Sequence, residues 1–248
     1  MPIIVYAIID LKRIADISIL TNLLFKNFGI HFDSISTSDL GAIISTGTPE
    51  AISINRESVL KYAAIIDYIA QNYSILPLRY GSIVATVDEG VSLLVKNNDI
   101  FLTTLDKIYN KEEYSIRVFI SQRHQDSTIN RPLPTTTSNI PQILLGTTKS
   151  KNYLLKKFQT HVTEESKKGY FDQLKSVFIV DLQRLTHLLD FKKNQSPECI
   201  MDVVLLIERS KRADLVAMVA DMQLKHPEHN IILTGPWPPY NFTQIKIQ

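Results

Sequence analysis

The chain has 248 residues, of which 44% are hydrophobic and 21% charged, a balance typical of a folded protein with one large or two modest domains. Its 27 basic and 25 acidic residues leave a net charge of +2, without the excess expected of a nucleic-acid binder or an enzyme for acidic substrates. The single cysteine, Cys199, excludes an intrachain disulfide and lies in an apolar run, where a small buried side chain is expected.

The N-terminal segment MPIIVYAIIDLKR predicts a buried strand over residues 3–9. It lacks the basic start and small-residue cleavage site of a signal peptide. A helix with apolar residues at helical spacing follows and ends at Gly29, and residues 30–46 predict two short strands around a turn. No apolar run approaches the roughly 20 residues that span a bilayer, so we expect no membrane partner and assembly in the cytoplasm.

Residues 55–74 predict an amphipathic helix capped by Asn55. The next segment, ILPLRYGSIVAT, predicts an edge strand or a strand with a bend, because a proline and a glycine interrupt it. Thr86 and Glu89 have the spacing of a capping box and open one helix that continues to Ile108. The alternating segment YSIRVFI then predicts a half-buried strand.

The polar segment RHQDSTINRPLPTTTSN contains two prolines and is typical of a linker. We therefore predict an α+β protein with an N-terminal domain over residues 1–125, a linker over 126–140 and a C-terminal domain over 141–248. In the C-terminal part, VFIVDL predicts a short strand and CIMDVVLLIE a long one. A helix capped by Ser210 and the strand NIILT complete a βαβ unit.

Motifs for chemistry are missing from the sequence. There is no glycine-rich phosphate loop, no HExxH, no CxxC and no GxSxG. Of the six histidines only His226 and His229 are close together, in a loop without further zinc ligands, so surface positions are expected. The Glu112–Glu113 pair and the lysines of residues 149–168 predict solvated charge. The residues therefore point to no catalytic or metal-binding site, and we expect no cofactor and no nucleic-acid partner.

Two segments stand out by their residue types. LPLRYGS places an arginine beside a tyrosine, and TGPWPPYNF combines three prolines with the only tryptophan. A rigid segment of this kind can bury aromatic area at low entropic cost, either against its own domain or against a partner. The candidate partner-binding or structural residues are Arg79, Tyr80, Gly235, Pro236, Trp237, Pro238, Pro239 and Tyr240.

These segments resemble the gas vesicle GvpL/GvpF family. ILPLRYGSIVAT is followed by a helix at DEGVSLL, and IILTGPWPPYNF follows the βαβ unit. An N-terminal VYAII strand, the strand YSIRVFI and a charged helix near NYLLKKF occur in the family's order, so the resemblance spans nearly the whole chain. The composition resembles the F branch of bacteria, including cyanobacteria, more than the acidic archaeal relatives.

The resemblance implies two α+β domains, of which the C-terminal one resembles a modified ferredoxin-like fold that ends in the aromatic, proline-rich tail. It implies a non-catalytic minor component required for gas vesicle assembly. The implied partners are the hydrophobic major shell protein and other accessory proteins, and the implied location is the gas vesicle, including its gas-facing surface.

The alternative function is a ferredoxin-like small-molecule-binding protein or enzyme. A cleft lined by Arg79, nearby tyrosines and loop histidines would be its signature. RNA binding by a ferredoxin-like sheet would need exposed aromatic residues on the central strands, where CIMDVVLLIE places aliphatic ones.

Overall fold

The computed structural model describes residues 2–47, 55–120, 169, 172, 176–193 and 199–245. These residues form two compact units, each built from more than one segment of the chain. The first comprises residues 1–114, 205–212 and 234–248, and the second comprises residues 115–204 and 213–233. The C-terminal tail therefore belongs to the first unit. The predicted linker over 126–140 lies outside the described residues, so its position stays a prediction.

The first unit is organised around one fully buried strand, β1 (Ile3–Asp10). On one side β1 pairs antiparallel with β3 (Leu40–Thr46), and β3 pairs in turn with β2 (Asp33–Ser36). On the other side β1 pairs with β4 (Leu76–Pro77) and β5 (Ile83–Val84), two short strands separated by a bend. The predicted strands of this half are confirmed, and the interrupted segment is indeed a strand with a bend.

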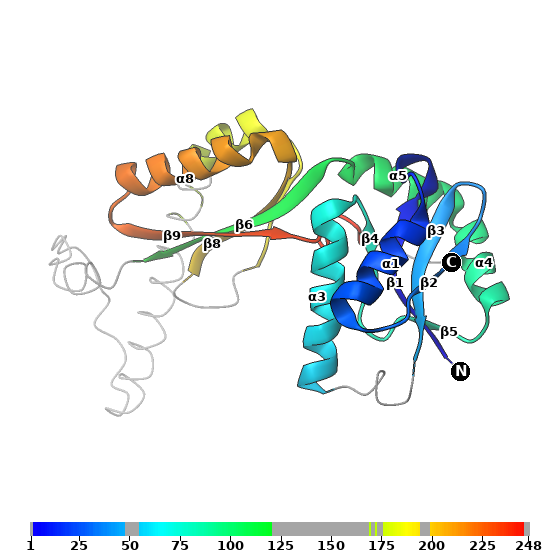
Figure 1. The fold of residues 1–248 in the computed structure, drawn as a ribbon. Helices are drawn as coiled ribbons and strands as arrows, with labels where there is room; N and C mark the ends of the chain where they lie inside the picture. The colour runs from blue at the N-terminus through cyan, green and yellow to red at the C-terminus, as the bar shows by residue number, and fades with distance from the viewer. Residues whose placement is uncertain are drawn as a thin grey trace, which may run out of the picture. The chain divides into compact units, whose positions relative to one another are not determined.

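Helices cover both faces of this sheet (Figure 1). The helices α1 (Ile17–Phe28) and α3 (Arg56–Asn72) share one hydrophobic core with β1, and α4 (Val87–Lys96) and α5 (Asn98–Ile108) contact the sheet as well. Because every residue of β1 is buried, neither face of this strand is left to solvent. The 3₁₀ turn η1 (Leu11–Arg13) connects β1 to α1.

The predicted caps of these helices are confirmed. The Asn55 side chain accepts a hydrogen bond from the Ser58 N–H at 2.8 Å, and Gly29 ends α1 with a φ of 64°. The Thr86 hydroxyl accepts from the Glu89 N–H at 3.1 Å, while the Glu89 carboxylate reaches back to the Ala85 N–H.

The single helix predicted over residues 87–108 is wrong, because it is interrupted at Asn97. The Asn97 side chain donates a hydrogen bond to the Leu93 carbonyl at 2.9 Å, and its backbone leaves helical geometry at φ −112° and ψ 16°. An asparagine amide that bonds to nearby backbone competes with helix continuation. Val95, expected in the buried stripe, is 61% exposed, whereas its neighbour Leu94 is buried.

The second sheet has the strand order β7-β8-β6-β9. The strand β8, the turn η2, the helix α8 and the strand β9 follow one another in the chain, and β6 lies between β8 and β9 in the sheet. A βαβ unit split by a third strand is the unit of ferredoxin-like folds. The bounds of these elements are β6 (Lys111–Ile120), β7 (Leu189–Phe191), β8 (Cys199–Glu208), η2 (Arg209–Lys211), α8 (Arg212–Lys225) and β9 (His229–Trp237).

Residues 176–185 are helical, which corrects the short strand predicted for VFIVDL. Phe178 and Leu182, four residues apart, are both buried, so a helical stripe rather than an alternating strand fits their spacing. This helix and α8 lie over the same face of the sheet in Figure 1. The predicted stripe of α8 is confirmed, but Ser210 lies inside η2 and does not cap the helix.

The histidine pair is more buried than a surface loop would allow. His229 is 3% exposed at the start of β9, and its ring stacks on that of His226 with centroids 6.1 Å apart. Phe178 meets the edge of the His226 ring. The surface expectation is therefore wrong for His229, which packs into the core of the second unit. Cys199 is buried as predicted, and burial raises the pKa of its thiol.

Candidate functional site

The segment that carries Arg79 and Tyr80 is fixed to the core by one buried tyrosine, Tyr62 of α3. Its hydroxyl lies 3.0 Å from the Leu78 carbonyl and 3.2 Å from that of Arg79, within donating distance of both. The Tyr80 ring meets the Tyr62 ring edge-on at 5.3 Å. Burial raises the pKa of Tyr62, so the phenol stays a hydrogen-bond donor. This contact leaves the Arg79 side chain exposed on the surface.

The tail continues β9 and packs within the first unit. Pro238 and Pro239 are buried, whereas Trp237 is 48% exposed. Two short-range hydrogen bonds give it a tight turn: the Tyr240 N–H donates to the Pro238 carbonyl and the Phe242 N–H to that of Pro239. The prolines thus form the side that packs on the protein, and the tryptophan faces outward.

A buried carboxylate holds this turn in place. The Glu113 side chain, on β6, accepts hydrogen bonds from the Asn241 backbone N–H at 2.9 Å and from its side-chain amide at 2.5 Å. Glu113 is 3% exposed, so the prediction of a solvated pair at Glu112–Glu113 is wrong. The physical reason is that both residues lie in a strand, where successive side chains point to opposite faces.

The two segments singled out in the sequence meet in one groove, which we call the signature groove. It encloses about 530 Å³. Arg79 lines it from the LPLR segment and Tyr240 from the tail, so residues more than 150 positions apart in the sequence share one surface. Most of its lining is apolar or uncharged: Leu76, Pro77, Leu78, Arg79, Ser82, Phe101, Tyr240, Asn241, Thr243, Gln244 and Ile245.

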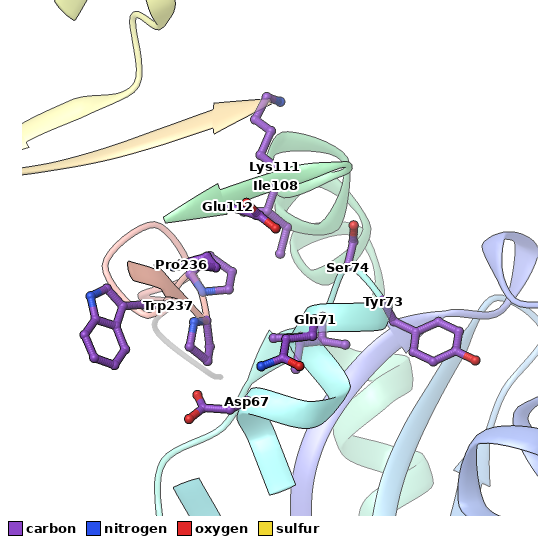
Figure 2. Close-up of a pocket in the computed structure, with 13 residues that line it drawn as sticks. Asp67, Gln71, Tyr73, Ser74, Ile108, Lys111, Glu112, Pro236 and Trp237 are labelled. Carbon is purple, nitrogen blue, oxygen red and sulfur yellow. The ribbon is translucent and has the colours of Figure 1, made fainter. Parts of the chain in front are cut away.

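A second, smaller depression lies beside residues 236–239, and we call it the tail pocket (Figure 2). Its walls are the C-terminal half of α3, the start of β6 and residues 236–239. Its volume is about 30 Å³, and it is partly open to solvent. Pockets for small-molecule ligands are about 300–1,000 Å³, so the tail pocket is small by comparison.

The two carboxylates that line the tail pocket, Glu112 and Asp67, differ in their surroundings. Glu112 accepts a hydrogen bond from the Tyr114 hydroxyl and lies 3.8 Å from the Arg209 guanidinium. Lys111 is turned toward α5, where its ammonium group donates to the Lys107 carbonyl. Burial raises the pKa of the Asp67 carboxyl above its ordinary value. Burial, together with the charge of Asp67, raises the pKa of Tyr240 to about 12.

Some of the singled-out residues are thus brought together and others are not. Arg79 and Tyr240 line the signature groove, Tyr80 packs on Tyr62, and Trp237 lines the tail pocket with the three prolines. Sequence reasoning missed Glu113 and Asp67, which the fold places against the tail. Among the residues that the structure describes, no group of three or more His, Cys, Asp or Glu side chains could hold a metal ion.

Comparison with known proteins identifies the family. The sequence profile described as gas vesicle synthesis protein GvpL/GvpF matches residues 3–244. The chain belongs to the GvpL/GvpF family. The sequence matches no curated protein at a significant level.

Two solved structures of GvpF share the fold of this family member. The crystal structure of the gas vesicle protein GvpF from Anabaena sp. PCC7120 has a TM-score of 0.73 at 14% identity, covering 99% of this chain and 97% of that one. GvpF from Microcystis aeruginosa has a TM-score of 0.69 at 13% identity, covering 98% and 99%. Family membership associates the protein with gas vesicles. No helix among the described residues is long and apolar enough to cross a membrane.

The Asp67 carboxylate of this GvpL/GvpF protein is expected to lower its stability at neutral pH. Its folded pKa is raised above the ordinary 3.8, so the folded state binds the proton more tightly than the unfolded state. Stability from this group therefore falls as pH rises through the window above 3.8 and stays lower beyond it.

We expect Asp67→Asn to be at least as stable as the wild type at pH 7, by up to about 0.5 kcal/mol. The gain should disappear in acid, where both side chains are neutral. Thermal unfolding at pH 7 and in acid measures this difference in stability. Glu57→Gln, at the exposed start of the same helix, is the matched control. A clear loss of stability for Asp67→Asn at pH 7 would contradict the assignment.

Proposed function

We propose that the protein is a non-catalytic minor component of gas vesicle assembly. It binds the hydrophobic major shell protein and other accessory proteins, and nucleates or assists shell formation. It is made in the cytoplasm and works at the growing vesicle, including the gas-facing surface. The observation that carries this proposal is the signature groove, in which both family-like segments converge on a largely apolar surface beside exposed aromatic residues.

The physical reason lies in the chemistry of a shell subunit. A protein rich in apolar surface aggregates unless that surface is covered before it is inserted. A groove lined by leucine, proline and aromatic side chains can cover a short apolar segment and remove its surface from water. Tyr240 lines the groove, and tyrosine is among the residue types that contribute most to protein–protein affinity.

The test is capture of the major shell protein by the wild type and by a Trp237→Ala, Tyr240→Ala double variant. We expect binding to fall roughly tenfold or more, because each aromatic anchor commonly contributes above 1 kcal/mol. Phe25→Ala is the control, since Phe25 on α1 is an aromatic residue that is also exposed, at 55%. Equal binding by a folded double variant would remove the tail from the interface, and no capture by the wild type would reject the proposed function.

The volume of the signature groove lies within the range of small-molecule sites, which is the observation that favours a ligand-binding protein. Such sites combine an apolar wall with several converging polar groups. Here Arg79 is the only charged side chain in the described lining. Thermal stabilisation by a metabolite, lost in Arg79→Ala, would support this alternative over shell-protein binding.

A further inference from the structure

We propose that the tail pocket is a docking site for a lysine ammonium group on a partner protein, held between the Asp67 carboxylate and the Trp237 indole. The proposal names the chemistry of one contact. That the lysine belongs to a gas vesicle protein rests on the proposed function above, whereas the recognition of the ammonium group does not.

Size is the first argument. The pocket has a volume of about 30 Å³, which is enough for a group the size of a water molecule. An ammonium group is a compact point charge of that size, whereas a guanidinium is a planar fork that needs a wider site. The small pocket therefore suits the ammonium group of lysine better than the guanidinium of arginine.

Charge is the second argument. In Figure 2 the Asp67 carboxylate points from α3 toward the side of the pocket where the tail and Trp237 lie. Two cations border the pocket, and neither hydrogen-bonds to Asp67: Lys111 donates to the Lys107 carbonyl, and Arg209 donates to the Ala70 and Gln71 carbonyls. Arg209 also lies 3.8 Å from Glu112, so its nearest carboxylate is Glu112. The partly buried Asp67 carboxylate is therefore electrostatically complementary to an incoming cation.

The position of the tryptophan is the third argument. Trp237 is 48% exposed, and its indole N–H donates to the Thr234 hydroxyl at 3.3 Å, which fixes the plane of the ring. Tryptophan is the best aromatic partner for a cation, and a contact over its face contributes about 0.5–2 kcal/mol. Pro238 and Pro239 keep the backbone beneath it rigid, so the ring is held in place before the partner arrives.

The experiment uses the full chain and a lysine peptide, acetyl-Gly-Lys-Gly-amide, with its Nε-acetylated form as the uncharged control. Trp237 is the only tryptophan in the sequence, so its emission reports on this pocket alone. We expect a saturable change with a dissociation constant on the order of millimolar for the lysine peptide and none for the acetylated one. Added salt should weaken the binding.

Variants separate the lysine site from general charge attraction. Asp67→Asn is expected to raise the dissociation constant of the lysine peptide roughly fivefold, while Glu57→Gln leaves it unchanged. An arginine peptide should bind less well than the lysine peptide. Equal titrations for wild type and Asp67→Asn, or for the charged and acetylated peptides, would overturn the proposal.

Capture of the shell protein then distinguishes the two proposals. If the wild type and Asp67→Asn capture it equally while the peptide binds the wild type, the lysine site holds and its occupant is another protein. If capture succeeds but the peptide does not bind, the proposed function stands and the lysine site is rejected.

Discussion

Replacing Gly235 by alanine is expected to destabilise the first unit by about 3 kcal/mol. Gly235 has a φ of +124°, in the half of backbone space that residues with a side chain rarely enter. An added Cβ would lie 2.8 Å from Cδ1 of Tyr114 and 2.9 Å from the Glu113 carbonyl oxygen. Because one of these atoms belongs to the backbone of β6, the contact cannot be relieved by a side-chain rotation. The backbone strain and the close contact with β6 therefore both contribute to the loss of stability.

Urea unfolding followed by Trp237 emission measures this loss, since the only tryptophan lies two residues from the substitution. Gly29→Ala is the matched control. Gly29 also has a positive φ, of +64°, but no atom lies within 4 Å of the added Cβ, so a loss of about 1 kcal/mol is expected there. Equal losses at the two positions would show that conformation alone matters and that the close approach to β6 does not.

Sequence reasoning succeeded where the signal is local. The helix over residues 56–72 follows from an apolar stripe and from a cap at Asn55, both of which lie within one turn of the residues they determine. The same holds for β1 and for Gly29 at the end of α1. The failure at Asn97 is also local: the asparagine can either continue the helix or bond back to the Leu93 carbonyl, and the sequence does not decide between them.

The site was less predictable because it depends on pairing between distant segments. Arg79 and Tyr240 were singled out as residues of unusual segments, and their common groove became visible only in the fold. Asp67 is one of several polar residues on α3, and nothing in its neighbours along the chain indicates burial beside a tail. An adjacent glutamate pair is typical of exposed helices, so the sequence predicts a solvated Glu113, whereas the fold buries it in β6.

Glu113 now offers the sharpest test of how the tail is held. Glu113→Ala is expected to destabilise the tail by about 3 kcal/mol, because it removes a buried carboxylate that accepts two hydrogen bonds from Asn241. Hydrogen bonds to a charged group contribute about 1.5–3 kcal/mol, and the donors left behind are partly buried. Amide hydrogen exchange at Asn241 and Trp237 emission should both report opening of the tail at lower urea than the wild type.

A double-mutant cycle isolates this contact from the effect of the cavity. Asn241→Ala alone should lower the free energy of unfolding less than Glu113→Ala does. The double variant should lower it little more than Glu113→Ala alone. The expected coupling energy is about 1–3 kcal/mol, whereas additive losses would show that Glu113 acts through other neighbours. Since the turn that Glu113 holds also carries Tyr240 into the signature groove, Glu113→Ala should weaken capture of the shell protein although Glu113 lines neither pocket. Undiminished capture by a variant with a loosened tail would mean that the partner itself orders the tail on binding.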